Sequence, residues 1–158
     1  MKRGEIPDYY LQDPKYFEGY ENEIRQLFGE GIVFDNRIAI HVRRGDYVDN
    51  PFYIDLTQEN YYLTAVTYFP GAKFLVFSDD IDWCKKYFQL QDCEFSEGKT
   101  PEEDLKLMAG CKGIIIANSS LSWWAAFLGD KNKKVVYPKR WFTDGVDRVG
   151  FPKGWICL

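Results

Sequence analysis

The sequence predicts an α/β protein with a Rossmann-like, doubly wound parallel sheet. Apolar runs of strand length alternate along the chain with segments of helical periodicity, which is the pattern of consecutive βαβ units. The runs are apolar almost throughout, as expected for strands that are covered on both faces. They span residues 37–42, 73–77, 113–117 and 134–137, with a brief further strand at 92–95.

Three helices are predicted in the first half of the chain. Residues 1–13 are polar and broken by proline, so they form a poorly defined lead-in. Apolar side chains at helical spacing predict a helix over 15–28, ended by glycine. Thr57 suits the N-cap of a second helix, 57–69, which a Pro-Gly pair stops. A short third helix, 81–88, follows a Ser-Asp-Asp cluster that can cap it.

Two more helices follow in the second half. Thr100 can cap a helix, Pro101 suits its first position, and Glu103 can reach back to close a capping box. That helix continues to residue 110, and the last one ends near Gly129. The aromatic side chains of the tail are expected to fold back onto the body; they are Trp141, Phe142, Phe151 and Trp155.

Composition limits the class of protein. The chain has 158 residues, 46% of them hydrophobic, without repeats or linkers, so one domain over 1–158 is expected. Twenty basic and twenty-four acidic residues give a net charge of −4. This balance leaves no footprint for nucleic acid or anionic membrane, so any anion must be bound by a local cluster.

Metal binding and secretion are not indicated. The four cysteines have no metal-ligand spacing, and His41 is the only histidine, so neither a metal site nor a cofactor is expected. The thiols are typical of a reduced, cytoplasmic protein. No transmembrane run and no signal-peptide core are present, and peripheral attachment to a membrane stays an open alternative.

The strongest local signal is the end of the first strand, where His41 and Val42 run into Arg43, Arg44, Gly45 and Asp46. Ligands of open α/β sheets bind beyond the carboxyl ends of the strands. An arginine fork donates two parallel hydrogen bonds to phosphate and keeps its charge. Arg43 and Arg44 are therefore predicted to hold a diphosphate. A solvated, charged turn is the alternative.

Two other strands end in polar clusters, Ser78-Asp79-Asp80 and Asn118-Ser119-Ser120. Because parallel strands share a direction, all three clusters should lie along one edge of the sheet. Ser119, Ser120 and the amides that open the next helix form a natural phosphate site. Plain capping is the alternative for these serines and for Asp79. The two arginines at the same edge favour a metal-free clamp for a nucleotide diphosphate.

Asp104 lies one turn into its helix, and two interpretations stay open. The carboxylate can complement the helix dipole, or it can accept hydrogen bonds from guanine, whose N1 and N2 both donate. Neither GxGxxG nor a Walker loop is present, so dinucleotide and NTPase interpretations lack their fingerprints.

Taken together, these segments resemble the motifs of the glycosyltransferase family 11 α-1,2-fucosyltransferases. Matches follow one another in order and spacing over nearly the whole chain. They are YLQDPKYF (10–17), HVRRGDY (41–47), VFSDD (76–80), DLKLM (104–108), ANSSLSWWAA (117–126) and YPKRWF (137–142). Each is short, but the set in sequence is specific.

The resemblance implies an inverting, metal-independent transfer of fucose from GDP-fucose to the 2-hydroxyl of a galactoside, on one half of a GT-B-type fold. It implies that Arg43 and Arg44 hold the β-phosphate and stabilise charge on the leaving GDP. His41 and Asp104 would read the guanine. Asp79, Ser119 and Ser120 complete the implied substrate-binding set, with the serines along the phosphates.

One part of the family pattern has no counterpart. Family members open with a glycine-rich GGxGNQ-like stretch in a preceding half, and nothing here matches it. The general base is therefore open, with Asp46 or Asp49 as candidates by position. The alternative to an enzyme is a non-catalytic GDP-sugar-binding module, or half of a split enzyme completed by a partner chain or by self-association. A decayed fragment that keeps only the fold is the remaining alternative.

Overall fold

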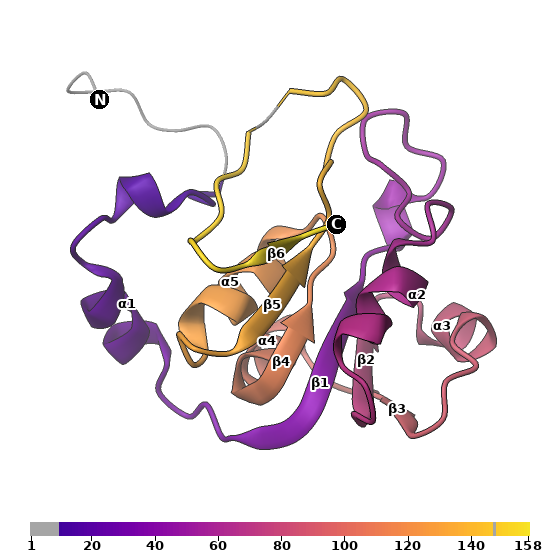
Figure 1. Ribbon diagram of the computed structural model, residues 1–158, viewed down its shortest axis with the longest axis horizontal. Helices are drawn as coiled ribbons and strands as arrows, with labels where there is room; N and C mark the ends of the chain where they lie inside the picture. Colours follow the sequence, from indigo (N-terminus) through magenta and orange to yellow (C-terminus); the bar gives the residue numbers. More distant parts are fainter. Residues whose placement is uncertain (1–9, 147) are drawn as a thin grey trace.

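The computed structural model describes residues 10–146 and 148–158, which build a six-stranded sheet whose paired strands are all parallel (Figure 1). Its strand order is β3-β2-β1-β4-β5-β6. The predicted α/β, Rossmann-like class is confirmed. The strands are β1 (Asp35–Val42), β2 (Phe74–Ser78), β3 (Cys93–Phe95), β4 (Cys111–Ile115), β5 (Lys134–Tyr137) and β6 (Ile156–Cys157).

Helices cover both faces of the sheet, as the continuous apolar strands require (Figure 1). One face packs against α1 (Glu21–Phe28), α4 (Pro101–Gly110) and α5 (Ser120–Leu128). The other packs against α2 (Tyr61–Ala65) and α3 (Ile81–Tyr87). Two hydrophobic cores result, one on each side of the sheet.

The central strand β1 divides its side chains between these cores. Ile38 and Ile40 belong to the cluster under α2 and α3, whereas Ala39 belongs to the cluster under α4 and α5. Successive strand side chains point to opposite faces, so His41 and Arg43 follow Ala39. This alternation decides which polar side chains at the end of β1 can meet α4 and α5.

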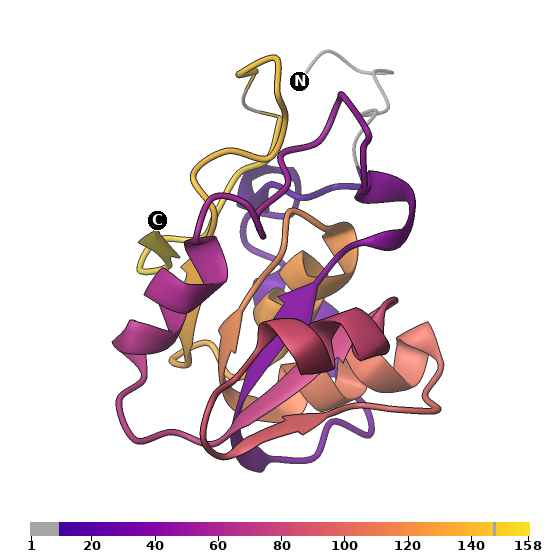
Figure 2. The same cartoon turned by 90° about the vertical axis from the view of Figure 1, so that its right-hand side faces the viewer.

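The topology creates a crevice at the carboxyl end of β1. From β1 the chain winds outward through β2 and β3, then returns to the other side of β1 with β4. Such a switch point is where open α/β sheets bind ligands. The segments after β1 and β5 lie at this same end of the sheet (Figure 2). They pair there through Ile54 N, which donates to Trp141 O at 3.1 Å.

The predicted helix over 15–28 is wrong in its first part. A short 3-10 turn, Pro14–Tyr16, comes first, and α1 begins only at Glu21. Gly19, at φ +88°, separates them in a conformation that no continuous right-handed helix contains.

The predicted helix over 57–69 is shorter than expected. Thr57 does not cap it, because its amide and hydroxyl both donate to Asp55 Oδ1 in a preceding turn. Asn60, in the left-handed region at φ 56°, precedes α2, and the segment closes as the 3-10 turn Val66–Tyr68. Local side-chain bonds have displaced the helix start.

Other expectations can be compared directly with the described residues. The capping box of Thr100 and Glu103 is confirmed, with Thr100 Nα donating to Glu103 at 2.7 Å. Residues 1–9 of the predicted lead-in lie outside the described residues. The rest of it is held firmly, because Trp124 Nε1 donates to Tyr10 O at 3.0 Å and Gln12 is buried. The last strand, β6, has no counterpart in the sequence prediction.

Candidate functional site

A pocket of about 460 Å³, here named the carboxyl-edge pocket, lies at the switch point of the sheet. Side chains reach it from the ends of β1 and β2, from the start of α5 and from α4. Seven of the eight predicted site residues line it: His41, Arg43, Asp46, Asp79, Asp104, Ser119 and Ser120. The prediction that the three polar clusters share one edge is confirmed.

Arg43 is one of the cations that line the pocket. Its guanidinium forms ion pairs with Asp46 and, at 3.0 Å, with Asp79, and it lies 5.4 Å from the ring centroid of Tyr47. An arginine fork donates to the oxygens of a carboxylate with the same planar geometry that it uses for the oxygens of a phosphate. The guanidinium is therefore oriented by its neighbours before any ligand is present.

Arg44 does not line this pocket. Its guanidinium lies 3.8 Å from the ring centroid of Trp83 on α3, and its Nε donates to Asp80 at 3.4 Å. Only the backbone amide of Arg44 turns back, donating to Asp79 Oδ1 at 2.8 Å. The physical reason is strand alternation, which sends neighbouring side chains to opposite faces. The predicted clamp of two arginine side chains is reduced to one.

His41 is buried at the pocket floor, with 4% of its surface exposed. Burial, and secondarily the charge of Arg43, lower the pKa of this imidazole to about 3. The ring is therefore neutral at neutral pH. Within residues 10–146 and 148–158, its Nδ1 has no hydrogen-bond partner. An orphaned buried nitrogen beside a pocket is the kind of group that a ligand satisfies.

Asp104 projects from the first turn of α4 into the pocket. Burial raises the pKa of its carboxyl, and the hydroxyl of Ser96 opposes this by donating to Oδ1 at 2.7 Å. Ser96 uses one acceptor site on this carboxylate, which leaves capacity to accept from a ligand. Capping belongs to Thr100 and Glu103, so Asp104 is not needed to close the helix end.

Ser119 and Ser120 mark the start of α5. Ser119 is the N-cap residue but makes no side-chain capping bond. Ser122 instead bridges the turn, accepting from Ala117 N at 3.2 Å and donating to Ser119 O. The capping interpretation of Ser119 is therefore wrong. Its hydroxyl and the amino end of α5 both lie at the pocket, where the helix dipole favours an anion.

Sequence reasoning missed three lining residues whose side chains could contact a ligand: Tyr47, Tyr53 and Lys99. Lys99 adds a second cation, from the loop between β3 and α4. The sequence contained a signal for Lys99, because a strand that ends at Phe95 and a capping box at Thr100 place the loop between them at the carboxyl edge. Tyr47 and Tyr53 stack with ring centroids 3.7 Å apart, and burial raises the pKa of Tyr47. No local pattern connects these two tyrosines.

The family follows from a comparison of the whole chain with family models. The model of glycosyl transferase family 11 matches residues 4–158. The chain belongs to glycosyl transferase family 11. The resemblance drawn from the motifs is thereby confirmed.

Curated relatives of this family 11 chain carry transferase names. Alpha-1,2-colitosyltransferase from Escherichia coli is 36% identical, over 84% of this chain and 54% of the relative. O-antigen biosynthesis glycosyltransferase WbnK from Escherichia coli is 36% identical, over 78% and 45% respectively. Galactoside 2-alpha-L-fucosyltransferase from Caenorhabditis elegans is 26% identical, over 97% and 52%. The chain thus spans about half the length of the curated relatives that it matches.

No solved structure is significantly similar to the chain. Among the described residues, no helix is long and apolar enough to cross a membrane. In the same part of the chain, no three His, Cys, Asp or Glu side chains are grouped so as to hold a metal ion.

Proposed function

We propose that this family 11 chain binds GDP-fucose in the carboxyl-edge pocket and serves in the transfer of fucose to the 2-hydroxyl of a galactoside. The observation that supports this most is the convergence of one oriented arginine, the start of α5 and a recessed carboxylate in a single pocket. The whole chain, 1–158, then acts as one nucleotide-sugar-binding domain without metal or cofactor.

In this proposal the nucleotide lies along the switch point. Arg43 holds the β-phosphate, with Lys99 as a second cation, and Ser119 and Ser120 contact the phosphates. Asp104 accepts from N1 and N2 of guanine, and His41 contacts the base. Asp79 keeps Arg43 in position through its ion pair. In this proposal Asp79 orients the arginine and does not itself contact the donor.

The proposed reaction is an inverting displacement. The oxygen of the acceptor's 2-hydroxyl forms a bond to the anomeric carbon while the bond from that carbon to the β-phosphate oxygen breaks. Electrons of the broken bond go to GDP, where Arg43 stabilises the new charge. Asp46 takes the acceptor proton, since its exposed carboxylate lies at the pocket beside Arg43. Asp49 does not line this pocket.

Two donors have to be distinguished, because a relative that is 36% identical is named for colitose and one that is 26% identical is named for fucose. Calorimetric titration with GDP-fucose, the corresponding colitose donor, GDP, ADP and UDP tests the proposal. Tight binding of GDP-fucose, with GDP preferred over ADP and UDP, is the expected outcome. Equal binding of all three nucleotides would remove the basis for a guanine site.

A second candidate function is a donor-binding module that a partner chain or a second copy completes. It is favoured by the chain's span of about half its relatives' length. Positioning of two reactants supplies several kcal/mol of barrier reduction, and part of that positioning resides outside this pocket if a second half is needed. We expect the purified chain to bind GDP-fucose but to transfer fucose to β-galactosides slowly. Following GDP release with and without acceptor decides between enzyme and module.

For localisation, we propose that the protein works in the cytoplasm at the surface of a membrane. All four cysteines are free thiols, as the cytoplasmic interpretation requires.

A further inference from the structure

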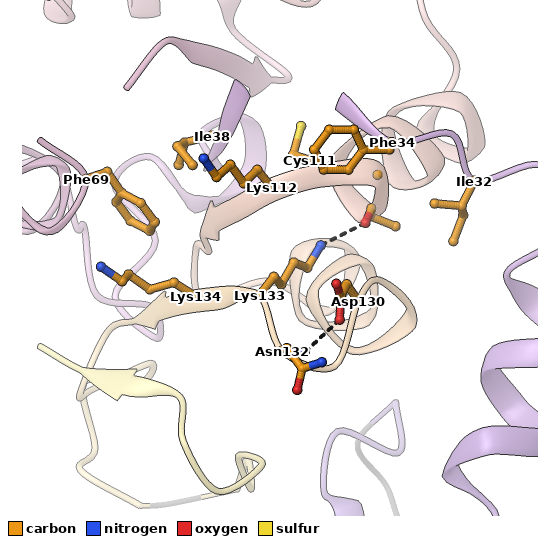
Figure 3. A pocket seen from close by; sticks show the side chains of 12 residues that line it. Ile32, Phe34, Ile38, Phe69, Cys111, Lys112, Asp130, Asn132, Lys133 and Lys134 are labelled. Carbon is orange, nitrogen blue, oxygen red and sulfur yellow. Dashed lines mark hydrogen bonds between the residues drawn. The ribbon is translucent and has the colours of Figure 1, made fainter. Parts of the chain in front are cut away.

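The sheet edge opposite the carboxyl-edge pocket is also hollowed. A cavity of about 570 Å³ lies at the amino ends of β1, β4 and β5 (Figure 3). Phe34, Ile38 and Phe69 give it apolar walls, and Lys112 and Lys134 reach over it from two neighbouring strands. An adjoining cavity of about 440 Å³ shares Ile38, Phe69 and both lysines. The two cavities form one apolar depression crossed by cations.

Large apolar side chains protrude from the segment that leads to this depression, and one of them, Phe34, lines it. Leu27, Phe28, Val33 and Phe34 have exposed fractions of 73%, 59%, 76% and 72%. They fall within eight residues of chain, at the end of α1 and in the turn that leads to β1. Single exposed apolar side chains are common on proteins, but four this close together mark an interaction surface.

The cations around the depression are available for a partner. Lys73, Lys112 and Lys134 are exposed, and none forms an ion pair with an acidic side chain within the described ranges. Lys134 also donates to the carbonyl oxygen of Tyr68 at 2.9 Å, which fixes its ammonium at this edge. Arg37 differs, because Asp35 and Glu94 neutralise it.

Lys133 lines the first cavity but has a structural role. Its ammonium donates to the carbonyl oxygens of Ala109 at 2.9 Å and Met108 at 3.3 Å, at the end of α4. Burial lowers its pKa to about 8. A cation that satisfies helix-end carbonyls is not free to recruit a partner.

The basal face is defined here by the exposed residues Leu27, Phe28, Val33, Phe34, Lys73, Lys112 and Lys134. We propose that the basal face docks on an anionic lipid bilayer. Lysine ammonium groups would contact headgroup phosphates while the apolar side chains enter the interfacial layer, the combination that interfacial binding uses. This inference does not depend on the proposed transferase function.

Charge distribution favours lipid over a second copy of the chain. The net charge of −4 is unevenly distributed between the two edges. The first basal cavity is lined by three lysines and one carboxylate, Asp130, whereas the carboxyl-edge pocket is lined by three aspartates with Arg43 and Lys99. A symmetric contact between two basal faces would bring like charges together. Anionic headgroups supply the opposite sign. Docking in this orientation leaves the carboxyl-edge pocket facing away from the bilayer.

Flotation with lipid vesicles tests the proposal on the full chain. Vesicles of phosphatidylcholine with about one third phosphatidylglycerol should carry the protein, and pure phosphatidylcholine vesicles should not. Exchanging Lys73→Gln and Lys112→Gln together should weaken partitioning about 25-fold, at about fivefold for each lysine. Phe34→Ser should weaken partitioning about tenfold, because the variant lacks the ring whose transfer from water into the interfacial layer favours binding. Added salt should weaken the parent protein as well.

Matched controls lie at other parts of the surface. Lys153→Gln and Val146→Ser change an exposed lysine and an exposed apolar residue away from the basal face and should leave partitioning unchanged. Equal binding to both vesicle types, or equal loss in the controls, would overturn the proposal. The proposal would also be overturned if the parent protein formed a dimer in sedimentation equilibrium and a basal-face variant lost this dimer while it still bound lipid. GDP titration of the same variants should match the parent, which separates this test from that of the proposed function.

Discussion

The buried histidine makes stability depend on pH in a way that can be calculated. His41 has a pKa of about 3 in the folded chain, against an ordinary value near 6.5. Protons therefore bind the unfolded chain more readily between these two values. The stability contributed by the neutral ring is complete above pH 6.5 and is lost as the pH falls toward 3. The full difference is about 5 kcal/mol, at about 1.4 kcal/mol for each unit.

At pH 5 the expected loss is about 2 kcal/mol relative to pH 8, because the unfolded imidazole is then almost fully protonated. For a chain of this length, about 2 kcal/mol corresponds to a decrease of about 4–8 °C in melting temperature. His41→Gln removes the titration while keeping a polar side chain of similar size. Melting curves of parent and variant at pH 8, 6 and 5 should therefore converge as the pH falls.

Carboxylates titrate in both proteins, so the difference between the two curves isolates His41. Because His41 is the chain's only histidine, NMR gives a second, direct readout. Its imidazole protons should show no titration between pH 8 and 5. A titration midpoint near 6.5, or parallel melting curves, would refute the inference that the ring is buried and neutral.

Three other predictions concern the carboxyl-edge pocket. Arg43→Ala should raise the Kd for GDP about 10- to 100-fold, because a charged hydrogen bond is lost. Arg44→Ala should leave that Kd unchanged and lower the free energy of unfolding by about 1 kcal/mol. Calorimetric titration with GDP and melting curves of both variants check these expectations. Gly45→Ala should weaken GDP binding because its Cβ would meet the Asp79 carboxylate, while Gly71→Ala, equally at positive φ but with open space around it, should only lower stability. Asp104→Asn should reduce the preference for GDP over ADP, and in the parent that preference should decline as the pH falls through the raised pKa of this carboxyl.

Contradicting outcomes are equally specific. Loss of GDP binding in Arg44→Ala with unchanged melting would mean that its side chain reaches the nucleotide. Equal effects of the two glycine exchanges would remove Asp79 from the account of how Arg43 is held. A parent protein that does not distinguish GDP from ADP would exclude the assignment of Asp104 to the base.

Much of the fold was predictable because its signals are local. Continuous apolar runs placed four of the six strands, and the brief strand predicted at 92–95 is β3. Thr100 with Glu103 marked the start of α4 correctly. The misses depend on interactions that no short pattern contains. Asp55 captures Thr57 and moves a helix start, and β6 exists only through pairing with β5.

The site was predictable in position more than in detail. Parallel strands guaranteed that the three polar clusters would share an edge. Adjacent arginines looked equivalent in the sequence, yet alternation along the strand separates Arg43 from Arg44, and this rule was available beforehand. The stacking of Tyr47 on Tyr53 was not, because it depends on the path of the whole loop between them.

The alternation of β1 also acts as an error check during folding. A slip of one residue against β2 or β4 would put His41 in the place of Ile40 and Ala39 in the place of Ile38. An imidazole would then be buried under α2, and a void would remain where an isoleucine packs. The same slip would turn Arg43 out of the pocket and Arg44 into it. Chains with a misaligned central strand therefore lose core packing and ligand site together, so a population selected for stability is also uniform in binding competence.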